Sequence, residues 1–102
     1  MNLYKLFRFY NKTIFNNALI KPKIMWFNKK GYDGMFEGDW IRGYDNYFKA
    51  RIKINECAEV HSTLLHEMVH LYQYQFNHTV NHKKSFKAWR RRIKKQMGID
   101  IK

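Results

Sequence analysis

Two histidines and a glutamate lie close together with the spacing of a metal-binding motif. His66, Glu67 and His70 occur as His-Glu-Met-Val-His. In a helix, His66 and His70 would lie roughly 40° apart around the axis and about 6 Å apart along it, so both imidazoles can bind one ion. Glu67 would then point beside the ion, where it can act as the general base for a water molecule. The motif therefore predicts a hydrolytic zinc site.

A catalytic zinc site usually has three protein ligands and an open position, so a third ligand is expected downstream of the motif. We expect His82 to be that ligand, because it adjoins the last predicted helix, whose packing can hold the imidazole toward the motif. His78, in the polar connection before it, is the alternative, and Glu59 and Asp39 are weaker candidates. The prediction is one zinc ion per chain, bound by the motif histidines and His82.

Apolar periodicity predicts the elements that must hold these residues. Leu3, Phe7 and Tyr10 recur at helical spacing, and Ile52 and Ile54 alternate with charged residues as in a strand with one buried face. The expected elements are a helix over 2–15, strands over 23–28, 35–41 and 48–55, a turn over 42–46, a motif helix over 56–74 capped by Asn55, and a last helix ending at Gly98.

Length and composition favour one domain. The chain has 102 residues, of which 45% are hydrophobic and 18% aromatic, which suffices for one packed core and is too short for two. Short strands joined by turns favour an antiparallel sheet flanked by helices. We therefore expect residues 1–102 to form a single α+β domain with a three-stranded antiparallel sheet.

Cysteine content and charge distribution argue against an exported or membrane protein. The single cysteine, Cys57, excludes an internal disulfide and a four-cysteine zinc ribbon. Lys5, Arg8 and Lys12 interrupt the N-terminal apolar residues, unlike the apolar core of a secretory signal. There is also no uncharged apolar run long enough to cross a bilayer. We expect a cytoplasmic protein with no membrane partner.

The motif and its surroundings resemble a known family. The sequence Thr-Leu-Leu-His-Glu-Met-Val-His-Leu-Tyr-Gln at 63–73, followed by Asn-His-Lys-Lys-Ser-Phe at 81–86, resembles the SprT-like metallopeptidases, which include Spartan. The expected order of elements is similar to the whole zincin-like catalytic domain of that family. The resemblance implies that His66, His70 and His82 bind zinc, that Glu67 is catalytic, and that Phe86 matches the aromatic residue after the third histidine.

Two features differ from the family pattern. Family members commonly have glycine directly after the third histidine, where this chain has Lys83. Larger relatives also carry a C-terminal zinc ribbon, so this chain would be a minimal version. Spartan-type relatives digest proteins crosslinked to DNA, and the resemblance makes that substrate class possible here.

An excess of basic residues gives a formal net charge of +12. Several lie on the outer side of the third strand or on the last helix, and the candidates for nucleic-acid contact are Lys49, Arg51, Lys53, Lys87, Arg90, Arg91 and Lys94. If the two faces are contiguous, they would bind the phosphates of single-stranded or nonspecific DNA in a salt-sensitive way. The alternative is a charged helix face that is merely solvated.

Three hypotheses about function follow from these observations. The first is a zinc endopeptidase, associated with DNA, that acts on protein substrates. The second is a non-catalytic, zinc-containing nucleic-acid-binding protein, and the third is a metal-dependent hydrolase that acts on a non-peptide bond. Replacing Glu67 by glutamine separates the first two, because only the first requires a general base.

Overall fold

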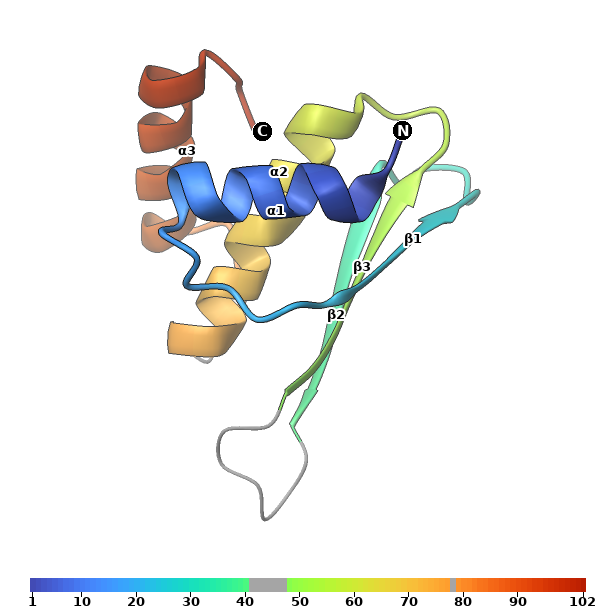
Figure 1. Cartoon of the computed structure of the whole chain (residues 1–102), viewed down its shortest axis with the longest axis horizontal. Helices are drawn as coiled ribbons and strands as arrows, with labels where there is room; N and C mark the ends of the chain where they lie inside the picture. The colour runs from blue at the N-terminus through green and yellow to red at the C-terminus, as the bar shows by residue number, and fades with distance from the viewer. Residues whose placement is uncertain (41–47, 78) are drawn as a thin grey trace.

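The computed structural model describes residues 1–40, 48–77 and 79–102. The predicted turn over 42–46 and His78 therefore lie outside the described residues. The elements are α1 (Leu3–Ile14), β1 (Lys23–Phe27), β2 (Gly34–Trp40), β3 (Phe48–Asn55), α2 (Val60–Tyr72), the π-helical turn η1 (Gln73–Asn77) and α3 (Lys84–Met97). The helices gather on one side of the sheet (Figure 1). The predicted α+β class is confirmed.

The sheet is mixed, so the antiparallel prediction is correct for only one of its two strand pairs. Its order is β1-β3-β2. β2 is antiparallel to β3, with Phe36 opposite Ile52, whereas β1 is parallel to β3, with Ile24 opposite Ile52. The reason is that β3 inserts between β1 and β2 instead of pairing with the far edge of β2, which would leave β2 in the middle. Because the chain reverses direction twice from β1 to β3, these two strands run the same way.

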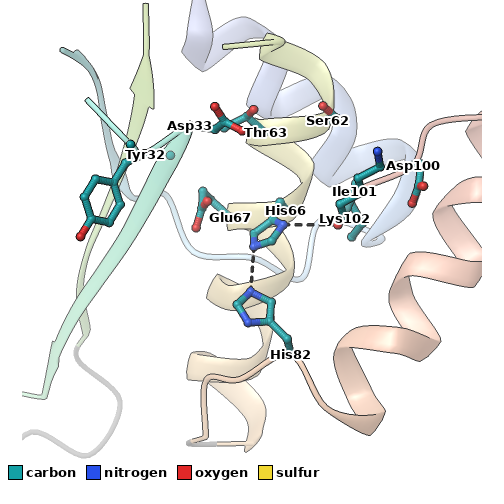
Figure 2. Close-up of a pocket in the computed structure, with 12 residues that line it drawn as sticks. Tyr32, Asp33, Ser62, Thr63, His66, Glu67, His82, Asp100, Ile101 and Lys102 are labelled. Atoms are coloured by element: carbon teal, nitrogen blue, oxygen red, sulfur yellow. Dashed lines mark hydrogen bonds between the residues drawn. The ribbon is translucent and has the colours of Figure 1, made fainter. Parts of the chain in front are cut away.

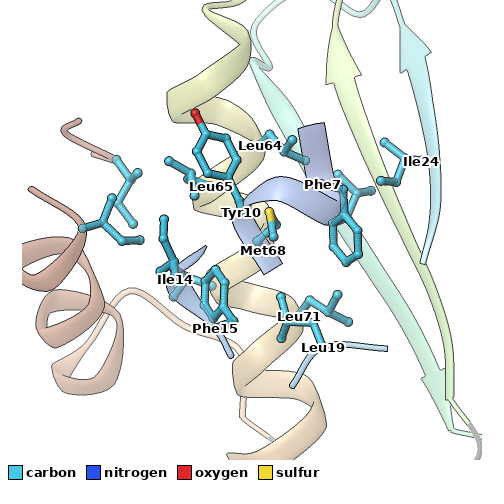
Figure 3. Packing of buried hydrophobic residues seen from close by; sticks show 14 of the residues in the cluster. Phe7, Tyr10, Ile14, Phe15, Leu19, Ile24, Leu64, Leu65, Met68 and Leu71 are labelled. Atoms are coloured by element: carbon cyan, nitrogen blue, oxygen red, sulfur yellow. The ribbon is translucent and has the colours of Figure 1, made fainter. Parts of the chain in front are cut away.

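The apolar face of β3 packs against α1 and α2 to form the core. Ile52 and Ile54 are fully buried, and so are Leu64 and Met68 of α2. Figure 3 shows residues of α1, including Tyr10, meeting this side of α2. Burying each large aliphatic side chain contributes about 1.5–3 kcal/mol relative to leaving it exposed. The helix that carries the motif is therefore held firmly by the core on its apolar side.

α2 begins at Val60, later than predicted, because Asn55 is not its N-cap. The side-chain amide of Asn55 donates instead to the carbonyls of Lys29 and Tyr32, at 3.0 and 2.8 Å, which fixes the loop before β2. The cap is Glu59, whose carboxylate accepts from two backbone N–H groups of the first helical turn at 3.1 and 2.7 Å. Glu59, one of the weaker candidate metal ligands, therefore caps α2 and does not belong to the group of residues that could hold a metal ion.

The segment after α3 returns to the core beside α2. Gly98 ends α3 in the left-handed conformation, with φ of 72°, as predicted for a C-terminal cap. The side chain of Ile101 is then buried in the hydrophobic core. This return brings residues 100–102 to the motif. No helix in the described part of the chain is both long enough and apolar enough to span a membrane.

Candidate metal centre

Three histidine side chains converge on one point. The Nε2 atom of His66 lies 3.2 Å from that of His70 and 3.0 Å from that of His82, and the Nε2 atoms of His70 and His82 are 3.1 Å apart. Among the described residues, these three form a group whose ligand atoms lie close enough together to hold a metal ion. Nitrogens about 2.0–2.1 Å from a tetrahedral zinc ion would be about 3.3 Å apart, so the donor set fits such an ion.

The three imidazoles come from two segments and share one aromatic neighbour. His66 and His70 lie one turn apart on α2, and His82 lies two residues before α3. The buried ring of Phe86 contacts all three, with centroid distances of 4.8 Å to His66, 5.3 Å to His70 and 4.8 Å to His82. Phe86 therefore limits the rotation of all three rings.

The carbonyl of Ile101 sets the tautomer of His66. Its oxygen lies 3.3 Å from Nδ1 of His66 (Figure 2). Because a carbonyl only accepts hydrogen bonds, Nδ1 must carry the proton, and the lone pair of Nε2 faces the other two histidines. Sequence reasoning missed this contact, because a backbone carbonyl has no signature in the sequence. The apolar Ile101 after a glycine cap was the available sign of a returning segment.

Burial favours the neutral form of the two motif histidines. It lowers the pKa of His70 to about 4. It also lowers the pKa of His66, and nearby His82 lowers that pKa further. Neutral imidazole is the form that binds metal ions. At neutral pH both side chains are therefore in the ligating state.

Glu67 is buried beside the histidines and lines the same cleft as His66 and His82. Burial raises the pKa of its carboxyl group to about 8, whereas a cation held nearby would favour the carboxylate. Figure 2 shows the carboxyl group directed to one side of His66, toward β2, which begins at Gly34. The side chain is thus placed next to the convergence point of the histidines and does not belong to their ligand group.

An open cleft of about 700 Å³ gives access to this group. Its walls are the loop 31–34, one side of α2 and the returning segment 100–102. His66, Glu67 and His82 line it, whereas His70 is buried beneath them. A molecule in the cleft would therefore meet Glu67 and the histidine cluster together.

Gly34 allows β2 to pack directly against the motif helix. A Cβ atom at this position would lie 2.6 Å from Cγ2 of Thr63 and 2.9 Å from Oε2 of Glu67, closer than side chains normally approach. We expect Gly34→Ala to lower the free energy of unfolding by about 1–3 kcal/mol through overpacking, as measured by urea denaturation. Lys49→Ala, at an exposed position of β3, should change it by less than about 0.5 kcal/mol. Equal stability of both variants would contradict this tight contact.

The basic residues predicted to contact nucleic acid fall into two separate groups. On β3, Arg51 and Lys53 form ion pairs with Glu37 of β2 at 3.2 and 2.8 Å, and Lys49 is exposed. The other group lies on α3, and α2 separates α3 from β3 (Figure 1). The two groups therefore lie on elements that are not neighbours in the fold.

The basic group on α3 surrounds a shallow hollow of about 530 Å³. Lys87, Arg91 and Lys94 line it together with Arg90, which forms a bidentate ion pair with Asp100 at 2.6 and 3.0 Å.

Of the other candidate metal ligands, the side chain of Asp39 and the whole of His78 lie outside the described part of the chain.

The chain matches a known protein family over nearly its whole length. The model of the SprT-like family matches residues 3–102, which include every described helix and strand. Among curated proteins no relative matches the chain.

Proposed function

The chain belongs to the SprT-like family, and we propose that it is a zinc-dependent endopeptidase that cuts exposed segments of proteins gathered on nucleic acid. The observation that carries this proposal is the convergence of three Nε2 atoms, 3.0–3.2 Å apart, beside Glu67 in an open cleft. Three imidazoles with an accessible side are typical of catalytic zinc sites, which keep one position open.

His66, His70 and His82 would hold the metal. Zinc bound there would polarise a peptide carbonyl and lower the pKa of a water molecule toward about 7. Glu67 accepts a proton from the attacking water as the new C–O bond forms. It then returns that proton to the amide nitrogen as the C–N bond breaks, which gives a carboxylic acid and an amine. The acid proton then passes to the amine, so the final products are a carboxylate and an ammonium group. The buried position of Glu67 keeps its carboxyl group at the cleft wall during both transfers.

The sheet offers a way to hold an extended substrate. In the order β1-β3-β2, β2 pairs with β3 along one edge, and its other edge has no partner strand within the described sheet. β2 starts at Gly34, which lines the cleft. An extended peptide can add to such an edge through main-chain hydrogen bonds. Most extended segments of a folded protein are already paired or buried, so unfolded or locally exposed segments are the expected substrates.

The basic hollow on α3 supports a role for nucleic acid. It presents several lysines and arginines within one 530 Å³ depression, on a protein of net charge +12. Such clusters bind phosphates without sequence preference. Substrates bound to the same nucleic acid would thereby be concentrated near the cleft.

Removing three charges from α3 tests this surface. We expect the triple variant Lys87→Gln, Arg91→Gln, Lys94→Gln to bind single-stranded DNA at least about tenfold more weakly, with a salt dependence reduced by about two units of log–log slope. Fluorescence anisotropy across a salt series measures both. The matched control removes three exposed charges from α1, with Lys5→Gln, Arg8→Gln and Lys12→Gln. An equal loss in both variants would indicate an effect of net charge alone.

A cleavage assay tests the proposed activity. Zinc-loaded protein is incubated with an unfolded protein and with its folded form, with and without single-stranded DNA, and in parallel after removal of zinc by a chelator. We expect cleavage of the unfolded form only, loss of activity on chelation, and recovery on adding zinc. Bound zinc and bound DNA without cleavage in any lane would favour the non-catalytic alternative. Hydrolysis of a small ester without protein cleavage would favour a non-peptide hydrolase.

A further inference from the structure

Gln73 is a fully buried polar residue to which the proposed reaction gives no role. It is the first residue of η1 and has no exposed surface. Burying a primary amide without partners costs at least about 1–3 kcal/mol, so its hydrogen bonds require an explanation. Its amide oxygen lies 2.9 Å from Nδ1 of His70 and 3.3 Å from the backbone nitrogen of Asn81, and its amide nitrogen lies 2.8 Å from Oγ of Ser85.

These contacts determine the tautomer of His70. The backbone N–H of Asn81 can only donate, so the side-chain atom of Gln73 that faces it must be the oxygen. The same oxygen faces Nδ1 of His70, so Nδ1 must also donate and therefore carries the ring proton. Nε2 of His70 is then left with its lone pair toward the other two histidines, which is the form that binds a metal ion.

Gln73 also joins the two segments that supply the ligands. It lies three residues after His70, on the same face of the helix, where side chains meet. One of its contacts is with Asn81, the residue directly before His82, and another is with Ser85 in the first turn of α3. The α-helix widens into a π-helical turn at this residue, a local change often found at functional sites.

We propose that Gln73 is a positioning residue that fixes the ligating tautomer of His70 and the placement of His82 together. This inference depends on the proposed metal site, because it assigns Gln73 to the support of that site. Partners that orient a metal-binding histidine typically change metal affinity by about 10–100-fold when removed. The predicted effect of losing Gln73 is therefore on zinc affinity, beyond any effect on folding.

The test measures zinc affinity by competition with a chromophoric chelator. Gln73→Met keeps nearly the same volume but removes the acceptor, and we expect affinity to fall by about 10–100-fold. Gln73→Glu keeps an acceptor for both N–H groups and should retain most of the affinity. Ser85→Ala removes only the third contact and should have a smaller effect than Gln73→Met. With Co²⁺ in place of zinc, the visible absorption of Gln73→Met should also differ from that of the wild type.

A packing control separates positioning from general destabilisation. Ile93→Val removes one methyl group from a fully buried side chain of α3 and should lower the melting temperature while leaving zinc affinity unchanged. If Gln73→Met does not fold, Gln73→Asn replaces it, because its shorter side chain cannot span the same contacts. Wild-type zinc affinity in folded Gln73→Met, or in Gln73→Asn where that variant replaces it, would overturn the inference, as would an equal affinity loss in Ile93→Val. A wild-type chain that binds no zinc would instead refute the metal site itself.

Discussion

Glu67→Gln should reduce peptide cleavage by about 10²–10⁴-fold while zinc binding is retained. Glutamine has nearly the same shape but cannot accept the proton of the attacking water. The three imidazoles that would hold zinc keep their positions, because Glu67 does not belong to their group. Initial cleavage rates on an unfolded protein, together with zinc content measured by mass spectrometry, give both quantities. Cleavage by Glu67→Gln at the wild-type rate would exclude Glu67 as the base.

The stability of the zinc-free chain provides a control for this variant. Burial raises the pKa of Glu67 from 4.5 to about 8, so between these pH values the folded chain binds more protons than the unfolded chain. The contribution of Glu67 to stability is then fully present below about pH 4.5 and is lost as the pH rises toward about 8. Relative to wild type, the Glu67→Gln variant should gain stability over this range in urea denaturation with a chelator present. A constant difference would contradict the buried position of the carboxyl group.

His82→Ala should abolish stoichiometric zinc binding and the stabilisation that zinc provides. His82 is exposed, so its truncation leaves no cavity and isolates the loss of a ligand. For wild type, zinc at 100 times its dissociation constant should add about 2.7 kcal/mol to the free energy of unfolding, and in His82→Ala this gain should nearly vanish. Thermal melts with and without zinc measure it.

His61→Ala is the matched control for this prediction. His61 lies on the same helix as the motif, but its Nδ1 is 2.6 Å from the hydroxyl of Tyr10 instead of facing the cluster. Its removal should lower stability equally with and without zinc. A full zinc complement in His82→Ala would mean that another residue is the third ligand.

The elements that follow from local periodicity were predicted well from the sequence. α1 spans Leu3–Ile14 within the predicted range 2–15, and β3 ends at Asn55 as expected, because both patterns are set by residues close in the chain. The sheet order was not predictable in this way. Whether β3 inserts between β1 and β2 depends on packing between distant residues, which strand propensity does not encode.

The proposed metal site shows the same contrast: contacts between residues close in the sequence were predictable, and contacts between distant residues were not. The proximity of His66 and His70 follows from helix geometry alone, and the choice of His82 depended on its adjacency to an expected helix. Gln73 and Ile101 were missed as supports of the histidines. Their roles depend on one side-chain amide and one backbone carbonyl that the tertiary fold brings to the two Nδ1 atoms. No residue spacing in the sequence indicates either contact.

Mass spectrometry of the products formed from an unfolded protein in ¹⁸O-labelled water tests directly whether the three-histidine cleft hydrolyses peptide bonds. Zinc-loaded wild-type protein should produce new peptide ends in which each new C-terminal carboxylate carries one ¹⁸O atom, as hydrolysis by water requires. Absence of new ends, from a chain shown to hold one zinc ion, would contradict the assignment of the three-histidine cleft to peptide hydrolysis.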